Sequence, residues 1–197
     1  MRRTVVAIAV MCLVTGSCGG SEPDTLSGYV RTPLPSVADV SLPDAGAGGA
    51  QFQMKAPEGE LLLVYFGYTS CPDVCPTTLA GLKEALASIG DDVERVTVAM
   101  ETVDIDRDSD EIITAYVRSF VPDAHGLRAR DDASLRAATD AFGADYQITV
   151  DEDGHVEVQH TPQLYAVDDQ GLIEVTWPFG TKPAAIANDI EILLRNA

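Results

Sequence analysis

Basic residues are scarce in this chain of 197 residues: 13 lysines and arginines stand against 31 aspartates and glutamates. The formal net charge at pH 7 is therefore −18. A surface of this sign repels phosphate groups, so binding to nucleic acid and electrostatic adhesion to anionic lipid are both unfavourable. We therefore predict that the protein has no nucleic-acid partner.

Long apolar segments are also missing from the N-terminal region. The apolar run Val5–Val14 is too short to cross a bilayer unaided. Two arginines precede it and small residues follow, which is the pattern of a secretory signal. The residues Thr15-Gly16-Ser17-Cys18 resemble a bacterial lipobox. We expect a signal peptide over residues 1–17 and lipid attachment at Cys18, with an ordinary cleaved signal as the alternative.

Such processing would place the protein on the extracytoplasmic side of the cell membrane, attached through its lipid anchor. Two positive charges would be lost with the signal, so the net charge would move from −18 to −20. Residues 18–27 are mostly small and polar, as is typical of a tether. Residues 28–197 show no internal repeat, and their length suits one domain.

Cysteine is also scarce in this chain. The chain has four cysteines, and only Cys71 and Cys75 lie beyond the predicted signal and anchor. In an exported protein such a pair forms either a disulfide or two thiolate ligands for a soft metal. A structural disulfide is disfavoured because it would close a loop too small to stabilise the fold much.

The cysteines follow the most apolar segment of the predicted domain. Leu61–Phe66 is six apolar residues in a row, without the alternation of a half-exposed strand. This pattern predicts a central strand that is buried on both faces of a sheet. Gly67 ends the strand.

A helix is expected to begin at the cysteines. Thr69 and Ser70 are N-cap residue types, and Pro72 suits a first helical turn. Cys71 should therefore lie where the helix begins, and Cys75 one turn later on the same face. The free N–H groups and positive dipole end of a helix start favour a thiolate over a thiol.

Hydrophobic periodicity predicts the remaining elements. These are a first helix to about Ile89, a strand over Val93–Thr102, a helix buried through Ile113, Tyr116, Val117 and Phe120, a short strand over Leu127–Arg130, a helix over Ala133–Phe142, hairpins over Tyr146–Val150 with Val156–His160 and over Gln163–Val167 with Leu172–Trp177, and a last amphipathic helix. This order predicts an α/β thioredoxin-like fold, in which helices flank a central mixed sheet. The proline-interrupted segment Tyr29–Met54 predicts extra edge strands or a hairpin.

Three motifs resemble the Sco/SenC family of thioredoxin-like copper proteins: YFGYTSCPDVCPTTL, TVDIDRDS and QHTPQLYAVDDQG. They occur in the family's order, and the resemblance covers roughly Ser36 to the C-terminus. It implies that Cys71, Cys75 and His160 bind copper, as Cu(I) or Cu(II). It also implies a role in assembling the dinuclear copper site (CuA) of cytochrome c oxidase subunit II.

Three further residues could surround these ligands, namely Asp73, Asp104 and Arg107. Asp73 lies between the cysteines, where it would complement the helix dipole. Asp104 and Arg107 are expected to form an ion-paired loop with Asp108. The family pattern is departed from at Ile105-Asp106, where Pro-Glu is usual, and at Pro162.

Residue chemistry agrees with copper, because thiolates select Cu(I) and an imidazole allows the same site to hold Cu(II). Zinc would normally need a fourth protein ligand. His125 and His155 are the remaining histidines, and both are predicted at ordinary surface positions. Met54 and Met100 fall in apolar strand contexts and are predicted to be core residues.

Two functions stay open, a copper metallochaperone and an extracytoplasmic thiol:disulfide oxidoreductase in which Cys71 and Cys75 cycle between dithiol and disulfide. The three-residue gap between the cysteines and the presence of His160 favour the first. A thiol peroxidase is weaker, because Tyr68 occupies the position where a threonine would be required. Thr161-Pro162 is predicted to lie opposite the cysteine loop, with a peptide bond that could be cis or trans.

Overall fold

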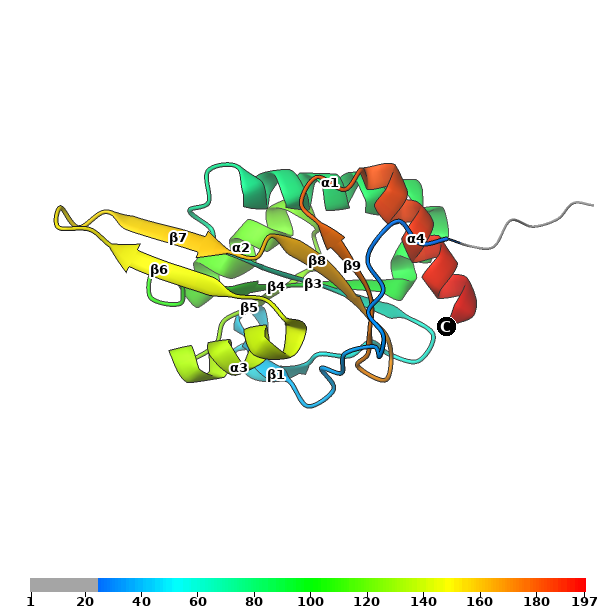
Figure 1. Ribbon diagram of the computed structural model, residues 1–197, viewed down its shortest axis with the longest axis horizontal. Coiled ribbons are helices and arrows are strands. Elements are labelled where there is room, and N and C mark those ends of the chain that lie inside the picture. The colour runs from blue at the N-terminus through cyan, green and yellow to red at the C-terminus, as the bar shows by residue number, and fades with distance from the viewer. Residues whose placement is uncertain (1–24) are drawn as a thin grey trace, which may run out of the picture.

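The computed structural model describes residues 25–197 (Figure 1). The predicted signal peptide and Cys18 lie outside these residues, so their assignment stays a prediction. The described helices are α1 (Val74–Ser88), α2 (Asp110–Phe120), α3 (Asp132–Phe142) and α4 (Pro183–Asn196). The described strands are β1 (Ser41–Asp44), β2 (Ala50–Gln53), β3 (Leu61–Gly67), β4 (Val96–Thr102), β5 (His125–Leu127), β6 (Tyr146–Val150), β7 (Val156–His160), β8 (Gln163–Val167) and β9 (Ile173–Pro178).

Seven strands form one mixed sheet in the order β2-β1-β5-β4-β3-β8-β9. Strand β3 pairs in parallel with β4 and antiparallel with β8, and all of its residues are buried. The prediction of a central strand that is buried on both faces is therefore confirmed.

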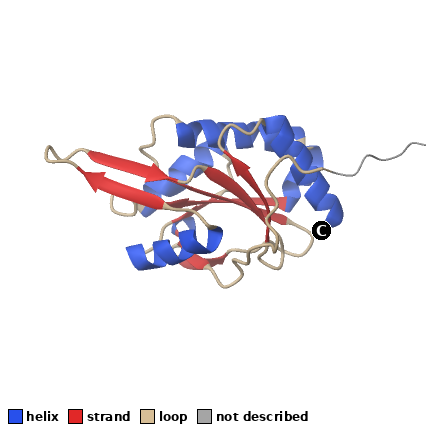
Figure 2. Ribbon diagram, viewed as in Figure 1, coloured by secondary structure: helices blue, strands red, loops and turns tan. Residues whose placement is uncertain are grey.

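Helices cover both faces of this sheet (Figure 2). One apolar cluster joins the sheet to α1, α2 and α4, through residues such as Leu79, Ile113 and Ile190. A second cluster joins the opposite face to α3, through residues such as Leu135 and Phe142. Met100 belongs to the first cluster and Met54 to the second, so both are core residues as predicted.

The N-terminal segment extends the main sheet. Strands β1 and β2 form an antiparallel hairpin, and Asp44 of β1 pairs with Leu127 of β5. A 3-10 turn over Ala45–Ala47 lies between them. The expected edge hairpin is confirmed.

Strands β6 and β7 form a separate two-stranded sheet. In Figure 1 this yellow hairpin extends beyond the rest of the molecule. Two hydrogen bonds close its base: the Thr161 N–H donates to the Asp145 carbonyl at 2.9 Å, and the Asp145 N–H donates to the Thr161 hydroxyl at 2.9 Å. We refer to residues 145–161 as the arm.

Two predicted strands differ from the structure. Strand β4 begins at Val96, because residues Gly90–Arg95 form a 3-10 helix. Strand β5 covers His125–Leu127 and does not continue to Arg130, because the Ala129 N–H donates to the Glu101 side chain at 2.8 Å instead of continuing the ladder. Side-chain acceptors of this kind cannot be read from a hydrophobic pattern.

None of the helices within residues 25–197 combines the length and the apolar character that crossing a membrane requires.

Candidate metal centre

Cys71 lies in the loop between β3 and α1, and Cys75 lies in the first turn of α1. The helix begins at Val74, so the expectation that it begins at Cys71 after Thr69 and Ser70 is wrong. Asp73 is the N-cap residue, but its side chain makes no capping hydrogen bond. Instead the Cys75 N–H donates to Cys71 Sγ at 3.3 Å. The sulfur therefore takes the capping role that an oxygen usually has.

Asp108 holds the loop that carries Cys71. Its buried carboxylate accepts the Thr69 N–H at 3.0 Å and the Thr69 hydroxyl at 2.5 Å. It also accepts the Thr102 hydroxyl at 2.5 Å. These bonds tie the cysteine loop to the end of β4, two residues before Cys71.

The predicted ion pair between Asp104 and Arg107 is present, with Arg107 Nε 2.6 Å from Asp104 Oδ2. This pair does not line the pocket at the cysteines. Asp73 does line that pocket, and its carboxylate accepts the Thr77 hydroxyl at 3.3 Å. Asp108 is expected from the sequence to belong to the same ion-paired loop. Its carboxylate instead accepts hydrogen bonds from neutral groups of Thr69 and Thr102.

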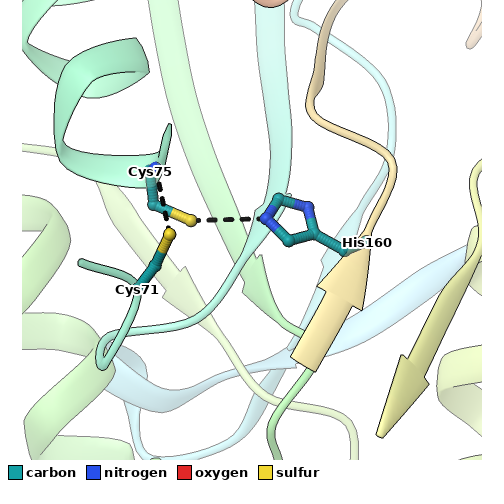
Figure 3. A group of neighbouring side chains, drawn as sticks. All are labelled: Cys71, Cys75 and His160. Carbon is teal, nitrogen blue, oxygen red and sulfur yellow. Dashed lines mark hydrogen bonds between the residues drawn. The ribbon is translucent and has the colours of Figure 1, made fainter. Parts of the chain in front are cut away.

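His160 is the last residue of β7, and its side chain points toward the cysteines (Figure 3). Its Nε2 lies 3.5 Å from Cys75 Sγ, although 85 residues separate the two in the chain. Its Nδ1 lies 3.2 Å from the Thr161 carbonyl oxygen. That contact is a hydrogen bond when Nδ1 carries the proton, which leaves the Nε2 lone pair directed at the sulfurs.

The imidazole is held in the form that can bind a metal. Burial lowers the pKa of His160, so the ring is neutral at physiological pH. Its ring packs edge-to-face against Tyr65 and Tyr68, with centroid distances of 6.0 Å and 5.9 Å. These contacts fix the orientation of the ring at the end of the arm.

The two thiols differ in their acidity. Burial opposes ionisation of Cys71, but the N–H groups of Cys75 and Asp73 outweigh it and hold the pKa of Cys71 below its ordinary value. Burial raises the pKa of Cys75 to about 12. Both cysteines are free thiols in the structure. At neutral pH Cys71 is the more reactive sulfur, while Cys75 loses its proton only when a cation compensates the charge.

The donor atoms of Cys71, Cys75 and His160 lie within 4.8 Å of one another. Donors that share one metal at bonds of about 2.0–2.3 Å are roughly 3.5–4 Å apart, so a small approach would close the site. No fourth Cys, His, Asp or Glu joins this group within residues 25–197. Two sulfurs and one imidazole nitrogen suit copper, and they do not complete a structural zinc site.

The remaining histidines lie away from this group. His125 Nδ1 is 2.6 Å from Asp44 Oδ2, and its ring is tilted against Phe52 at a centroid distance of 4.6 Å. His155 is exposed in the arm. The Thr161–Pro162 bond is trans, since the cis bond found in the described chain is Thr32–Pro33.

Sequence reasoning missed the residues that make room for the sulfurs. A Cβ on Gly67 would lie 2.8 Å from Tyr65 Cε1 and 3.0 Å from Cys75 Sγ, so only glycine fits there. The sequence predicts Gly67 only as the end of a strand. The sequence predicts Tyr65 only as part of an apolar run, and no hydrophobic pattern indicates how closely Tyr65 and Cys75 pack at Gly67.

The site is open to solvent on one side. A pocket of about 340 Å³ borders Cys71 and His160. Its other lining residues are Tyr68, Pro72, Asp73, Val74, Val158, Gln159 and Pro162. A metal held by the three donors would therefore be accessible from this pocket.

The SCO1/SenC family model matches residues 45–195. The SCO2-like protein of Rickettsia felis is 30% identical over 125 residues, which cover 62% of this chain and 60% of that protein. The chain thus spans about three fifths of the length of that relative.

Solved structures are similar over more of the chain. The structure of Bradyrhizobium japonicum ScoI with copper bound has a TM-score of 0.67 at 29% identity, and the match covers 78% of this chain and 96% of that chain. The apo Sco1 protein of Thermus thermophilus has a TM-score of 0.73 at 28% identity, over 86% of this chain and 97% of that chain. The thioredoxin-like fold predicted from the sequence is confirmed.

Proposed function

Because the chain belongs to the SCO1/SenC family, we propose that it is a copper-binding metallochaperone that assists assembly of the CuA site of cytochrome c oxidase subunit II. The observation that carries this proposal is the convergence of two sulfurs and a neutral imidazole nitrogen, with all donor atoms within 4.8 Å. A related protein of Bradyrhizobium japonicum has been solved with copper bound.

The donor set supports copper in either oxidation state. Two thiolates satisfy Cu(I), and the imidazole of His160 adds the nitrogen that Cu(II) prefers. Binding would displace the proton of Cys75, whose pKa of about 12 otherwise keeps the thiol neutral. Metal and disulfide therefore compete for the same sulfurs.

The open pocket supports transfer of the metal. Three protein ligands leave a coordination position free on the pocket side, where a ligand from an acceptor protein could attach before the donor ligands leave. A fully enclosed four-ligand site would not permit such an exchange. The pocket beside Cys71 and His160 offers this access.

We further propose that the protein works on the extracytoplasmic face of the cell membrane, anchored by a lipid on Cys18. The lipobox-like residues before Cys18 support this placement. Cys18→Ala should release the protein from membranes and leave copper binding unchanged, because the site involves only residues of the folded domain. Wild-type protein recovered wholly in the soluble fraction would contradict the anchor.

Copper titration of the reduced protein tests the main proposal. We expect one copper per chain when Cys71 and Cys75 are reduced, and none when they are joined in a disulfide. Subsequent mixing with the copper-free soluble domain of subunit II should move the copper to that domain. Equal copper in the reduced and the oxidised protein would contradict the proposal.

Thiol:disulfide exchange is the second candidate function, and the unequal acidity of the two thiols favours it. Cys71 is half-buried and has a lowered pKa, as an attacking thiol requires, while Cys75 is buried. His160→Ala separates the two functions. Reduction of subunit II cysteines should survive this change, whereas Cu(II) binding should not.

A further inference from the structure

The arm has one apolar face and one polar face. Side chains alternate across a strand, and opposite residues of paired strands share a face. One face carries three cross-strand pairs: Tyr146 with His160, Ile148 with Val158, and Val150 with Val156. We call these six residues the arm face. The other face carries Gln147, Thr149, Glu157 and Gln159.

The arm face is uncovered beyond its base. Val150 is 64% exposed and Ile148 is 38% exposed, while Val156 and Val158 are half-buried. Strands β6 and β7 pair only with each other, so within residues 25–197 no third strand shields them. Neighbouring exposed apolar side chains on one face of a strand pair are the kind of surface at which a protein partner can bind.

The arm face is continuous with the candidate metal centre. His160 is its innermost residue, and Val158 lines the pocket beside Cys71 and His160. A protein that approached the metal through this pocket would therefore contact Val158, whose cross-strand neighbour is Ile148. Figure 1 shows the arm reaching outward from the end of the sheet where the cysteine loop lies.

The surroundings of the arm face are acidic. Residues 137–181 contain no lysine or arginine. The arm itself carries five carboxylates, at Asp145, Asp151, Glu152, Asp153 and Glu157. Only Asp145 has a cationic partner among the described residues, at 2.8 Å from Arg136. The complementary surface would be apolar at its centre and basic at its rim.

The base of the arm is rigidly attached, so the face is presented in one orientation. The Tyr146 hydroxyl donates to Asp132, and the Arg136 guanidinium lies 3.7 Å from the centroid of the Tyr146 ring. His160 is paired with Tyr146 at that base, so the attached end of the arm also positions the imidazole.

We infer that the arm face is the docking surface for the metal-exchange partner, a protein that carries an apolar patch beside its own metal ligands and lysine or arginine residues around it. This inference rests on the proposed function, because it assumes that copper passes through the pocket. Docking there would place the ligands of the partner at the open side of the site. It would also bring the partner against the strand that positions His160.

The test uses the double variant Ile148→Ser, Val150→Ser, with Gln147→Ser, Thr149→Ser as the matched control on the opposite face. The probe is the copper-free soluble domain of oxidase subunit II from the same organism. Calorimetry should show binding weakened at least about tenfold by the first variant and unchanged by the control. Copper binding, followed by absorption spectra, should be the same in both variants.

A second variant tests the charge argument without touching the arm face. Glu152→Lys, Asp153→Lys should weaken binding of the same probe and reduce its dependence on salt. Circular dichroism would check that both arm variants remain folded. Unchanged affinity together with an unchanged salt dependence would overturn the basic rim proposed for the partner.

Failure of this inference can be told from failure of the proposed function. If the wild type transfers copper and the arm variants transfer and bind equally well, the docking surface is wrong and the function stands. If the wild type binds the probe through the arm but transfers no copper, the surface stands and the function is wrong. Absence of any binding overturns both. A wild-type dimer that the arm variants abolish would assign the face to a second copy of the chain and overturn the inference.

Discussion

The two halves of the candidate metal centre are built in different ways. The sulfur half belongs to the body of the molecule, because Cys75 packs in the core beside β3 and Asp108 ties the loop before Cys71 to β4. The imidazole half belongs to the arm, which pairs with no strand of the main sheet. The body thus fixes the distance between the sulfurs, while the arm determines whether the nitrogen is present.

This difference separates the ligands by the oxidation state of copper that they suit. Two thiolates on a fixed frame can satisfy Cu(I), whereas the imidazole on the arm adds the nitrogen that Cu(II) prefers. The imidazole of His160 is held by its bond to the Thr161 carbonyl and by the edges of Tyr65 and Tyr68, while its backbone pairs with Tyr146 in the arm. The predictions below separate the contributions of the two halves.

The largest effect is expected from removal of the sulfur half. Cys71→Ala, Cys75→Ala should bind no copper in either oxidation state, because one imidazole alone cannot hold the metal against solvent. Metal analysis after gel filtration measures this directly, and circular dichroism shows whether the variant is folded. A folded variant that retains one copper per chain would place the site elsewhere.

Removal of the imidazole half should have a selective effect. His160→Ala should lose the coloured Cu(II) form, with affinity lowered by more than about 100-fold, since a lost ligand costs more than a lost neighbour of a ligand. Cu(I) binding should persist through the two thiolates. Competition titrations with chelators for each oxidation state provide the measurement.

The exposed His155, also on the arm, is the matched control for this variant. His155→Ala should keep both copper forms. If His160→Ala gives an unchanged Cu(II) spectrum, the arm supplies no copper ligand. Thiol:disulfide exchange would then be the better supported function.

Loss of the Asp108 carboxylate, which holds the loop before Cys71, should weaken the sulfur half alone. Asp108→Ala leaves the Thr69 N–H and two hydroxyls without their acceptor, which should cost about 2–4 kcal/mol of stability. Urea unfolding measures the loss. Asp106→Ala, at an exposed position of the same loop, is the control and should change stability little. Equal stability of the two variants would show that the hydrogen bonds accepted by Asp108 do not stabilise the fold.

The smallest effect concerns proton loss within the sulfur half. Cys71 should react with iodoacetamide along a pH profile centred below the ordinary cysteine pKa, because N–H donors stabilise its thiolate. Cys75 should stay unmodified until the pH nears its pKa of about 12. Mass spectrometry of digested protein at a series of pH values distinguishes the two sites. Equal modification of both cysteines at neutral pH would contradict the proposed asymmetry.

Much of the fold could be predicted from the sequence, because periodicity reports burial. The six apolar residues of β3 and the strands of both hairpins follow the predicted pattern closely, since local alternation and turn residues determine them. Element ends were harder to predict. The start of α1 depends on the Cys71 sulfur acting as a cap, and the end of β5 depends on the Glu101 side chain.

Some residues of the candidate site could likewise be predicted from the sequence, and others could not. Cys71 and Cys75 stand out in the sequence because they follow a buried strand at a short spacing. His160 is distant in sequence, and only the family resemblance linked it to the cysteines before the structure brought it to 3.5 Å from Cys75 Sγ. The space left by Gly67 has no signal in a hydrophobic pattern, because it depends on close packing between β3, Tyr65 and Cys75.

X-ray absorption spectroscopy of the copper-loaded protein tests most directly whether the two halves act on one metal. The wild type should show two copper–sulfur contacts and one copper–nitrogen contact with the multiple scattering of an imidazole. His160→Ala should lose the nitrogen contact and keep both sulfurs. A wild-type spectrum with sulfur ligands alone, or one identical to that of His160→Ala, would contradict a site formed by Cys71, Cys75 and His160.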